Sequence, residues 1–132
     1  MICTDKQIEE LEARYKLKLP AAYIAFLKGK YPEVYPILTG SDYGYSYLVK
    51  LRNCAEELLQ ENGNPFQLAQ NDFVFIMHQG YQFLFFPCGE DTDNPPVYYY
   101  LEGEPDKELK FDRFTDWIEL LKEEVILYKI SE

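Results

Sequence analysis

Residues 73–103 read FVFIMHQGYQFLFFPCGEDTDNPPVYYYLEG, and this stretch decides the fold. Residues 73–77 are apolar at every position, which predicts a strand covered on both faces. Gln79-Gly80 separates them from a second apolar run, residues 81–86, and Gly80 can adopt the positive φ of a two-residue hairpin turn. Residues 97–101 follow a polar loop and predict a third strand. The stretch therefore predicts a strand cluster that begins with an antiparallel hairpin.

Helices are predicted on both sides of these strands. Thr4 with Gln7 forms a capping-box pattern, and an apolar helical face follows it. Pro20 suits the first turn of a second helix. Near the other end, Trp117 belongs to the apolar face of a C-terminal helix that Asp112 or Thr115 could cap. That face has the spacing i, i+3, i+4, i+7 and i+11: Phe114, Trp117, Ile118, Leu121 and Val125. We interpret Trp117 as a core residue rather than a ligand-stacking one.

The region before residue 73 is predicted to contain a strand and a short helix. Residues 42–51 begin with three tyrosines that alternate with Gly and Ser, the period of a strand: Tyr43, Tyr45 and Tyr47. This tyrosine row is either a half-buried sheet face or an interface. Asn53 with Glu56 predicts a helix start. Residues 31–40 read as a loop, and residues 109–111 as a short edge strand.

These elements predict an α+β fold: a single antiparallel β-sheet packed by an N-terminal helix pair, one middle helix and a C-terminal helix. The 132 residues suit one domain over residues 1–132. No apolar run approaches the roughly 18 residues of a membrane span, and no signal peptide is visible. Three widely spaced cysteines and one histidine argue against a zinc site and indicate reduced thiols in a cytoplasmic protein.

The formal charge is −10, from 13 basic and 23 acidic residues. This charge argues against nucleic acid and anionic membranes as partners. It either serves solubility or steers a basic protein partner. Residues 90–108 contain seven acids and one lysine, and they flank the third predicted strand. An acidic rim around tyrosines suits a basic partner, whereas two solvated loops are the alternative. The predicted partner-binding residues are Glu90, Asp91, Asp93, Tyr98, Tyr100, Glu102 and Glu104.

Catalytic patterns are sparse. His78 ends an apolar strand, and no nucleophile motif accompanies it, so we interpret it as structural. Glu90, Asp91, Asp93 and Asn94 could form a calcium loop, but such residues before Pro-Pro also form ordinary turns. No Gly-rich phosphate loop is present. We therefore predict no enzyme activity, no cofactor and no metal.

Three segments resemble the SUKH superfamily, in the order of that family. The first is Ile8-Glu9 followed by Leu19-Pro20-x-x-Tyr23-x-x-Phe26-Leu27. The second is residues 75–86, with Gln79-Gly80-Tyr81-Gln82 in the middle, followed by Asp93-Asn94-Pro95-Pro96-Val97-Tyr98. The third is Phe114-x-x-Trp117-Ile118. Many members carry a Gly-rich stretch after the second helix, of which Lys28-Gly29-Lys30 is a reduced version.

The superfamily contains Smi/Knr-type regulators of fungal cell-wall glucan synthesis and many bacterial immunity proteins. The resemblance implies an α+β fold and a non-enzymatic role, in which the protein binds and neutralises a polymorphic or contact-dependent toxin domain by occlusion. A basic toxin would fit the −10 charge. The alternative is a regulatory or scaffold module in cell-wall or envelope assembly. The resemblance implies no catalytic residues and leaves the binding face and the oligomeric state open.

Overall fold

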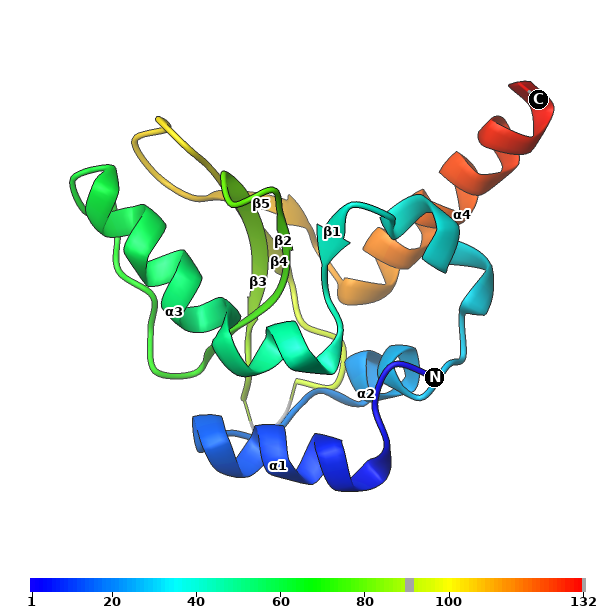
Figure 1. Ribbon diagram of the computed structural model, residues 1–132, viewed down its shortest axis with the longest axis horizontal. Coiled ribbons are helices and arrows are strands. Elements are labelled where there is room, and N and C mark those ends of the chain that lie inside the picture. The colour runs from blue at the N-terminus through cyan, green and yellow to red at the C-terminus, as the bar shows by residue number, and fades with distance from the viewer. Residues whose placement is uncertain (90–91, 132) are drawn as a thin grey trace.

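The computed structural model describes residues 1–89 and 92–131 (Figure 1). Within them lie five helices and one five-stranded sheet, which confirms the predicted α+β class. The elements in chain order are α1 (Asp5–Tyr15), α2 (Ala21–Leu27), the 3₁₀ helix η1 (Pro32–Leu38), β1 (Ser41–Asp42), α3 (Tyr45–Glu61), β2 (Asp72–His78), β3 (Gln82–Pro87), β4 (Val97–Leu101), β5 (Glu108–Phe111) and α4 (Phe114–Ser131).

The sheet is an antiparallel meander, because the strands lie in the order β1-β2-β3-β4-β5. At the predicted hairpin turn, the N–H of Tyr81 donates to the carbonyl of His78 at 3.2 Å. Gln79 and Gly80 have φ of 49° and 78°. Positive φ at both central residues is typical of a type I′ turn, so the predicted turn is confirmed. The strands are separated by three residues rather than two, because β3 begins at Gln82.

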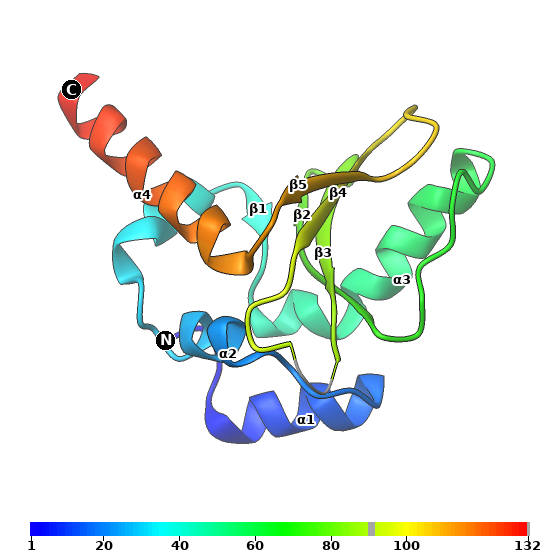
Figure 2. The same cartoon turned by 180° about the vertical axis from the view of Figure 1, so that it is seen from behind.

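Helices cover both faces of the sheet. In Figures 1 and 2, α3 lies over one face, and α2, η1 and α4 lie on the other side. The prediction for β2 is therefore confirmed: every residue from Phe73 to Met77 is at most 7% exposed. A register shift between Val74 and Ile76 leaves Phe75 as an extra residue in β2. The ring of Phe75 packs against Trp117 of α4, with centroids 5.1 Å apart.

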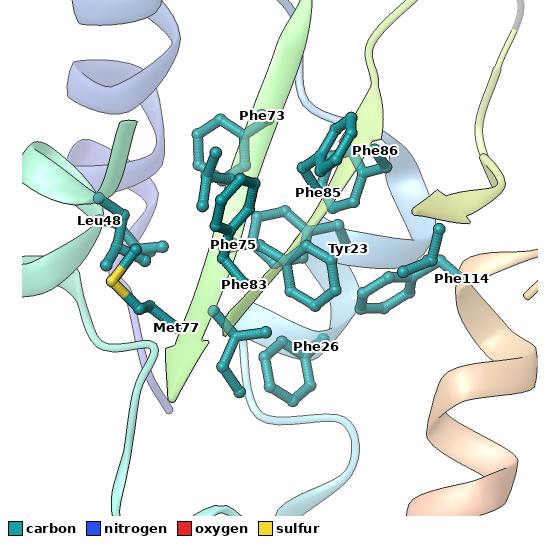
Figure 3. Close-up of a cluster of buried hydrophobic side chains, with 14 of the residues drawn as sticks. Tyr23, Phe26, Leu48, Phe73, Phe75, Met77, Phe83, Phe85, Phe86 and Phe114 are labelled. Carbon is teal, nitrogen blue, oxygen red and sulfur yellow. The ribbon is translucent and has the colours of Figure 1, made fainter. Parts of the chain in front are cut away.

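Tyr23 of α2 is the centre of an aromatic core (Figure 3). Its ring centroid lies 5.1–6.1 Å from those of five phenylalanines, which come from α2, β2, β3 and α4: Phe26, Phe73, Phe75, Phe86 and Phe114. Edge-to-face pairs of this kind add to the free energy gained by burying the rings. The central stretch of sequence therefore provides the sheet, and the two flanking helices complete the core over it.

The predicted strand over residues 42–51 is wrong. Only Ser41 and Asp42 pair with β2, and a helix, α3, begins at Tyr45. The period-2 tyrosines end after Tyr47, whereas the buried apolar residues continue at helical spacing: Leu48, Leu51, Ala55, Leu58 and Leu59. This longer amphipathic face packs on β2 and decides the conformation, because burial of a whole face outweighs the local preference of a few residues. The tyrosine row is therefore not a sheet face.

The start of α4 is capped from a distant loop. Asn94 accepts a hydrogen bond from the N–H of Thr115 at 3.0 Å and donates to its Oγ at 2.8 Å. An N-terminal N–H of a helix has no partner within the helix, so this contact satisfies one of them. The predicted caps were Asp112 and Thr115. Thr115 lies inside α4 and forms the two hydrogen bonds with the capping residue, Asn94.

Candidate functional site

The connection between β4 and β5, together with the first residue of β5, forms an exposed acidic segment, residues 102–108, which we call the acidic hairpin. It contains four acids, Glu102, Glu104, Asp106 and Glu108, and one base, Lys107. Gly103 has φ of 88°, which favours glycine at this position. The N–H of Glu104 donates to the carbonyl of Leu101 at 3.0 Å and closes the turn.

The acidic hairpin is anchored to the end of α3. The N–H of Gly103 donates to Asn62 Oδ1 at 2.6 Å, while Asn62 Nδ2 donates to the carbonyl of Leu58 at 2.7 Å. Asn62 therefore joins two segments that are 41 residues apart. Glu61, exposed at the last position of α3, directly precedes Asn62 in the chain. Sequence reasoning missed Asn62, since no local pattern predicts so distant a contact.

The carboxylates of the acidic hairpin lack a salt-bridge partner in the part of the chain that the structure describes. No ion pair among the described residues includes an acid of residues 102–108. The ammonium of Lys107 lies 5.4 Å from the centre of the Phe66 ring and 5.5 Å from that of Tyr98, the geometry of a cation–π contact. The one base is therefore positioned over aromatic rings, and the acids remain available to a partner.

The carboxylates of the acidic hairpin also affect two tyrosines of β4. Burial first, and then the carboxylates of Glu102 and Glu104, raise the pKa of Tyr100. Burial, followed by the carboxylates of Glu108 and Glu104, raises the pKa of Tyr99. Both tyrosines stay neutral at physiological pH, so β4 adds no charge to the site.

The structure separates the predicted partner-binding residues. Asp93 precedes β4, where its carbonyl accepts the N–H of Ala22 at 2.9 Å, beside α2. Glu102 and Glu104 follow the other end of this five-residue strand, roughly 13 Å away along it. Glu90 and Asp91 lie outside the described residues. The described acids of the predicted rim therefore lie at the two ends of β4, where the sequence placed them.

Tyr98 and Tyr100, the two tyrosines among the predicted partner-binding residues, differ in how much of the side chain is exposed. Tyr100 is 0% exposed and packs on Phe83, with centroids 5.7 Å apart, so its predicted exposure is wrong. Tyr98 is half-buried and stacks on Phe85 at 5.6 Å. Both side chains point to the α3 side of the sheet, because alternate residues of a strand share a face. Of the seven predicted residues, Glu102 and Glu104 are the ones found together on an exposed surface.

A groove of about 320 Å³ opens on the other face of the sheet, between the sheet, η1 and α4. Its apolar walls include Ile76 and Phe111 from the sheet, and Trp117, Leu120 and Leu121 from α4. Polar groups lie among them: Ser41, His78, Gln82, Lys110 and Glu124.

His78 Nδ1 lies 3.1 Å from Ser41 Oγ. The two residues are register partners of β2 and β1, so strand pairing by itself accounts for the contact. Within residues 1–89 and 92–131, no three His, Cys, Asp or Glu side chains are grouped so that they could hold a metal ion. The calcium-loop interpretation rests in part on Glu90 and Asp91, which are not described. None of the described helices has an apolar stretch long enough to cross a bilayer.

Comparison with known proteins identifies the family. No curated protein and no solved structure matched the chain. Among protein families, the SMI1 / KNR4 family (SUKH-1) matched residues 2–120, nearly the whole chain. The match covers α1, the whole sheet and the packed part of α4. The chain therefore belongs to the SMI1 / KNR4 family (SUKH-1), as its resemblance to the SUKH superfamily predicted.

Proposed function

We propose that this protein is a non-enzymatic immunity protein that binds a basic toxin domain and neutralises it by occlusion. Membership of the SUKH-1 family supports a role of this general type. The observation that carries the proposal is the acidic hairpin, an exposed loop whose acids have no ion pair among the described residues. In this proposal it is the first contact surface for the toxin.

Electrostatics favours a basic partner at this site. Residues 102–108 have a formal charge of −3. Charges of one sign on a surface raise the rate of encounter with a partner of the opposite sign, up to the range of 10⁸ M⁻¹s⁻¹ at low salt. Attraction between exposed charges weakens when they are farther apart than the Debye length, which is about 8 Å at physiological salt.

The anchoring of the acidic hairpin favours tight binding as well. A loop that is mobile before binding loses conformational entropy when a partner orders it. The bonds from Asn62 to Gly103 and to Leu58 hold the loop against α3 in the unbound chain. The acidic hairpin therefore loses less conformational entropy when a partner binds, and a larger share of the interaction energy contributes to affinity.

The direct experiment co-expresses this chain with the variable C-terminal domain of a secreted protein encoded beside its gene. We expect growth to be rescued and a one-to-one complex to be recovered. If the toxin domain still kills and no complex forms, the immunity role is wrong. In that case, capture of a housekeeping envelope-assembly protein would support the alternative role as a regulatory or scaffold module.

The docking surface is tested by two matched charge reversals. Glu102→Lys with Glu104→Lys changes the acidic hairpin, and Glu9→Lys with Glu33→Lys makes the same change of net charge on exposed positions of α1 and η1. We expect the first pair to slow association roughly tenfold and to remove its dependence on salt, whereas the second pair has a much smaller effect. Equal effects of the two pairs would show that the acidic hairpin is not the docking surface.

A further inference from the structure

The last turns of α4 expose large apolar side chains to solvent. Residues 125–130 read VILYKI, and we call them the apolar extension. Ile126, Leu127 and Ile130 are 57%, 65% and 76% exposed. Residues four apart in a helix share a face and adjacent residues point about 100° apart, so Ile126, Leu127 and Ile130 lie on one side of α4. An apolar side of a helix is normally buried, so the apolar extension is suited to be covered by another molecule.

The apolar extension projects away from the body of the protein. In Figures 1 and 2 the C-terminal part of α4 extends past the sheet, on the side opposite the acidic hairpin. The groove begins at its base, where Trp117, Leu120 and Glu124 of α4 form one wall. Leu120 is itself 39% exposed. Leu120 and Leu127 are seven residues apart and share one side of α4, so the groove and the apolar extension follow the same side of the helix, with Glu123 and Glu124 between them.

We propose that this surface is the contact of a homodimer, in which the α4 helices of two copies pair antiparallel. Residues 120 and 130 are about 15 Å apart along a helix. If the helices cross near Val125, Ile130 of each copy lies opposite Leu120 of the other, at the groove. Each apolar extension would then be covered by the partner's helix on one side and by the partner's groove on another.

Charge favours a second copy in the antiparallel orientation. Each chain carries −10, so two copies repel unless the acids near the contact meet basic groups of the other copy. The apolar extension contains Lys129 and no acid, whereas Glu119, Glu123 and Glu124 precede it on α4. Antiparallel pairing places the basic part of one helix near the acidic part of the other, and parallel pairing would align like charges. A basic protein would be attracted to the acidic hairpin instead.

The available area fits a dimer. The exposed side chains of the apolar extension, together with Leu120, present on the order of 500 Å² of apolar surface, at the upper end of what a monomer usually exposes. The walls of the groove add to this. A standard interface takes about 800 Å² from each partner, so the groove and the apolar extension together provide most of one. The acidic hairpin remains outside the contact, and the dimer does not depend on the proposed toxin binding.

The oligomeric state of the purified full chain tests the proposal. Sedimentation equilibrium should give twice the chain mass of 15.6 kDa, with a concentration-dependent transition to monomer. Leu127→Asp and Ile130→Asp should each raise the dissociation constant roughly thirtyfold or more without loss of helix content. The matched control is Leu109→Asp on β5, since Leu109 is also 50% exposed but lies outside the contact. The control should leave the dissociation constant unchanged.

A monomer at every concentration would overturn the proposal, and so would an equal effect of Leu109→Asp. Sedimentation with phosphatidylcholine vesicles separates dimerisation from insertion into a lipid surface. Binding to vesicles by a chain that stays monomeric without them would also overturn it.

Cysteine cross-linking tests the antiparallel orientation, in a chain whose half-buried Cys54 is replaced by Ser. A mixture of Leu120→Cys and Ile130→Cys copies should form a disulfide-linked dimer under mild oxidation. Neither variant alone should cross-link, because like positions lie about 15 Å apart in the antiparallel pair. Cross-linking of Ile130→Cys alone would indicate a parallel contact and contradict this arrangement.

Discussion

The two halves of α4 contain the same kind of residues in opposite surroundings. In the first half, residues 114–121, Phe114, Trp117 and Ile118 are 0%, 4% and 1% exposed. In the second half, Ile126 and Ile130 are 57% and 76% exposed. The difference is what lies beneath the helix, because the sheet ends where the second half begins to project. Apolar sequence therefore indicates that a surface should be covered, whereas the tertiary structure decides whether the same chain covers it.

Removing a ring from the packed half should have the largest effect. Trp117 packs against Phe75 at 5.1 Å and against Phe26 at 5.6 Å. Trp117→Ala should lower the free energy of unfolding by about 3–5 kcal/mol, because it removes buried apolar surface and leaves a cavity. Urea denaturation followed by circular dichroism measures the loss. A loss below about 1 kcal/mol would contradict the role of this half in holding the fold together.

The interior beneath the helices should also make stability depend on pH. Burial raises the pKa of Cys3 to about 11. Burial first, and then the charges of Asp72 and Glu12, raises the pKa of Cys88 to about 12. The unfolded chain releases these protons from about pH 9, whereas the folded chain retains them. The contribution to stability is therefore complete below about pH 9 and is lost as the pH rises toward 11–12.

Urea midpoints at about pH 8 and about pH 10.5 measure this dependence, with Cys88→Ala as the comparison. The variant should lose less stability over this interval than the native chain, because one buried thiol no longer titrates. The same loss in both chains would show that other groups cause the pH dependence.

The cap of α4 is expected to contribute less than its packing. Asn94→Ala removes both hydrogen bonds to Thr115 and should cost about 1 kcal/mol, the usual effect of losing a helix N-cap. Asn53→Ala is the matched control, since Asn53 is exposed within α3 and should show no loss. Thermal unfolding compares the two variants. An equal change in both would mean that Asn94 does not stabilise the start of α4.

The smallest effect is expected in the projecting half. At protein concentrations where the chain is monomeric, Ile126→Ala and Ile130→Ala should change the free energy of unfolding by less than about 0.5 kcal/mol. If the proposed dimer forms, the effect of Ile130→Ala should grow as the protein concentration rises, because dimerisation stabilises the folded chain. A large loss in the monomer would show that this residue contributes to the fold of its own chain.

Most of the fold could be predicted because its signals are local. The capping box of Thr4 and Gln7 forms as predicted, with each residue bonded to the backbone N–H of the other. The turn at Gln79-Gly80 has the expected positive φ values. The failure at residues 42–51 is instructive, since a period-2 tyrosine pattern lay upstream of a longer helical face. That face, extended back from Ala55 to Leu48, was the signal that could have corrected it.

The candidate site was predicted in part. The acidic charge of residues 102–108 can be read from the sequence, and so can its position after a strand. The sequence placed Asp93 and Glu102 at opposite ends of that strand, and the structure has them there. The burial of Tyr100 also required the structure, because it depends on the packing of α3 and Phe66 over that face of the sheet.

By itself, the sequence determined the class of fold, the hairpin, the C-terminal helix and the excess of acids, because turn geometry, apolar period and charge depend on neighbouring residues. Tertiary structure alone decided that Asn62 anchors the acidic hairpin, that Asn94 caps α4 and that α4 extends past the sheet. These features join residues that are far apart in the chain, or depend on where the sheet ends. Packing sets the distances between helices and strands, so these distances cannot be read from local residue patterns.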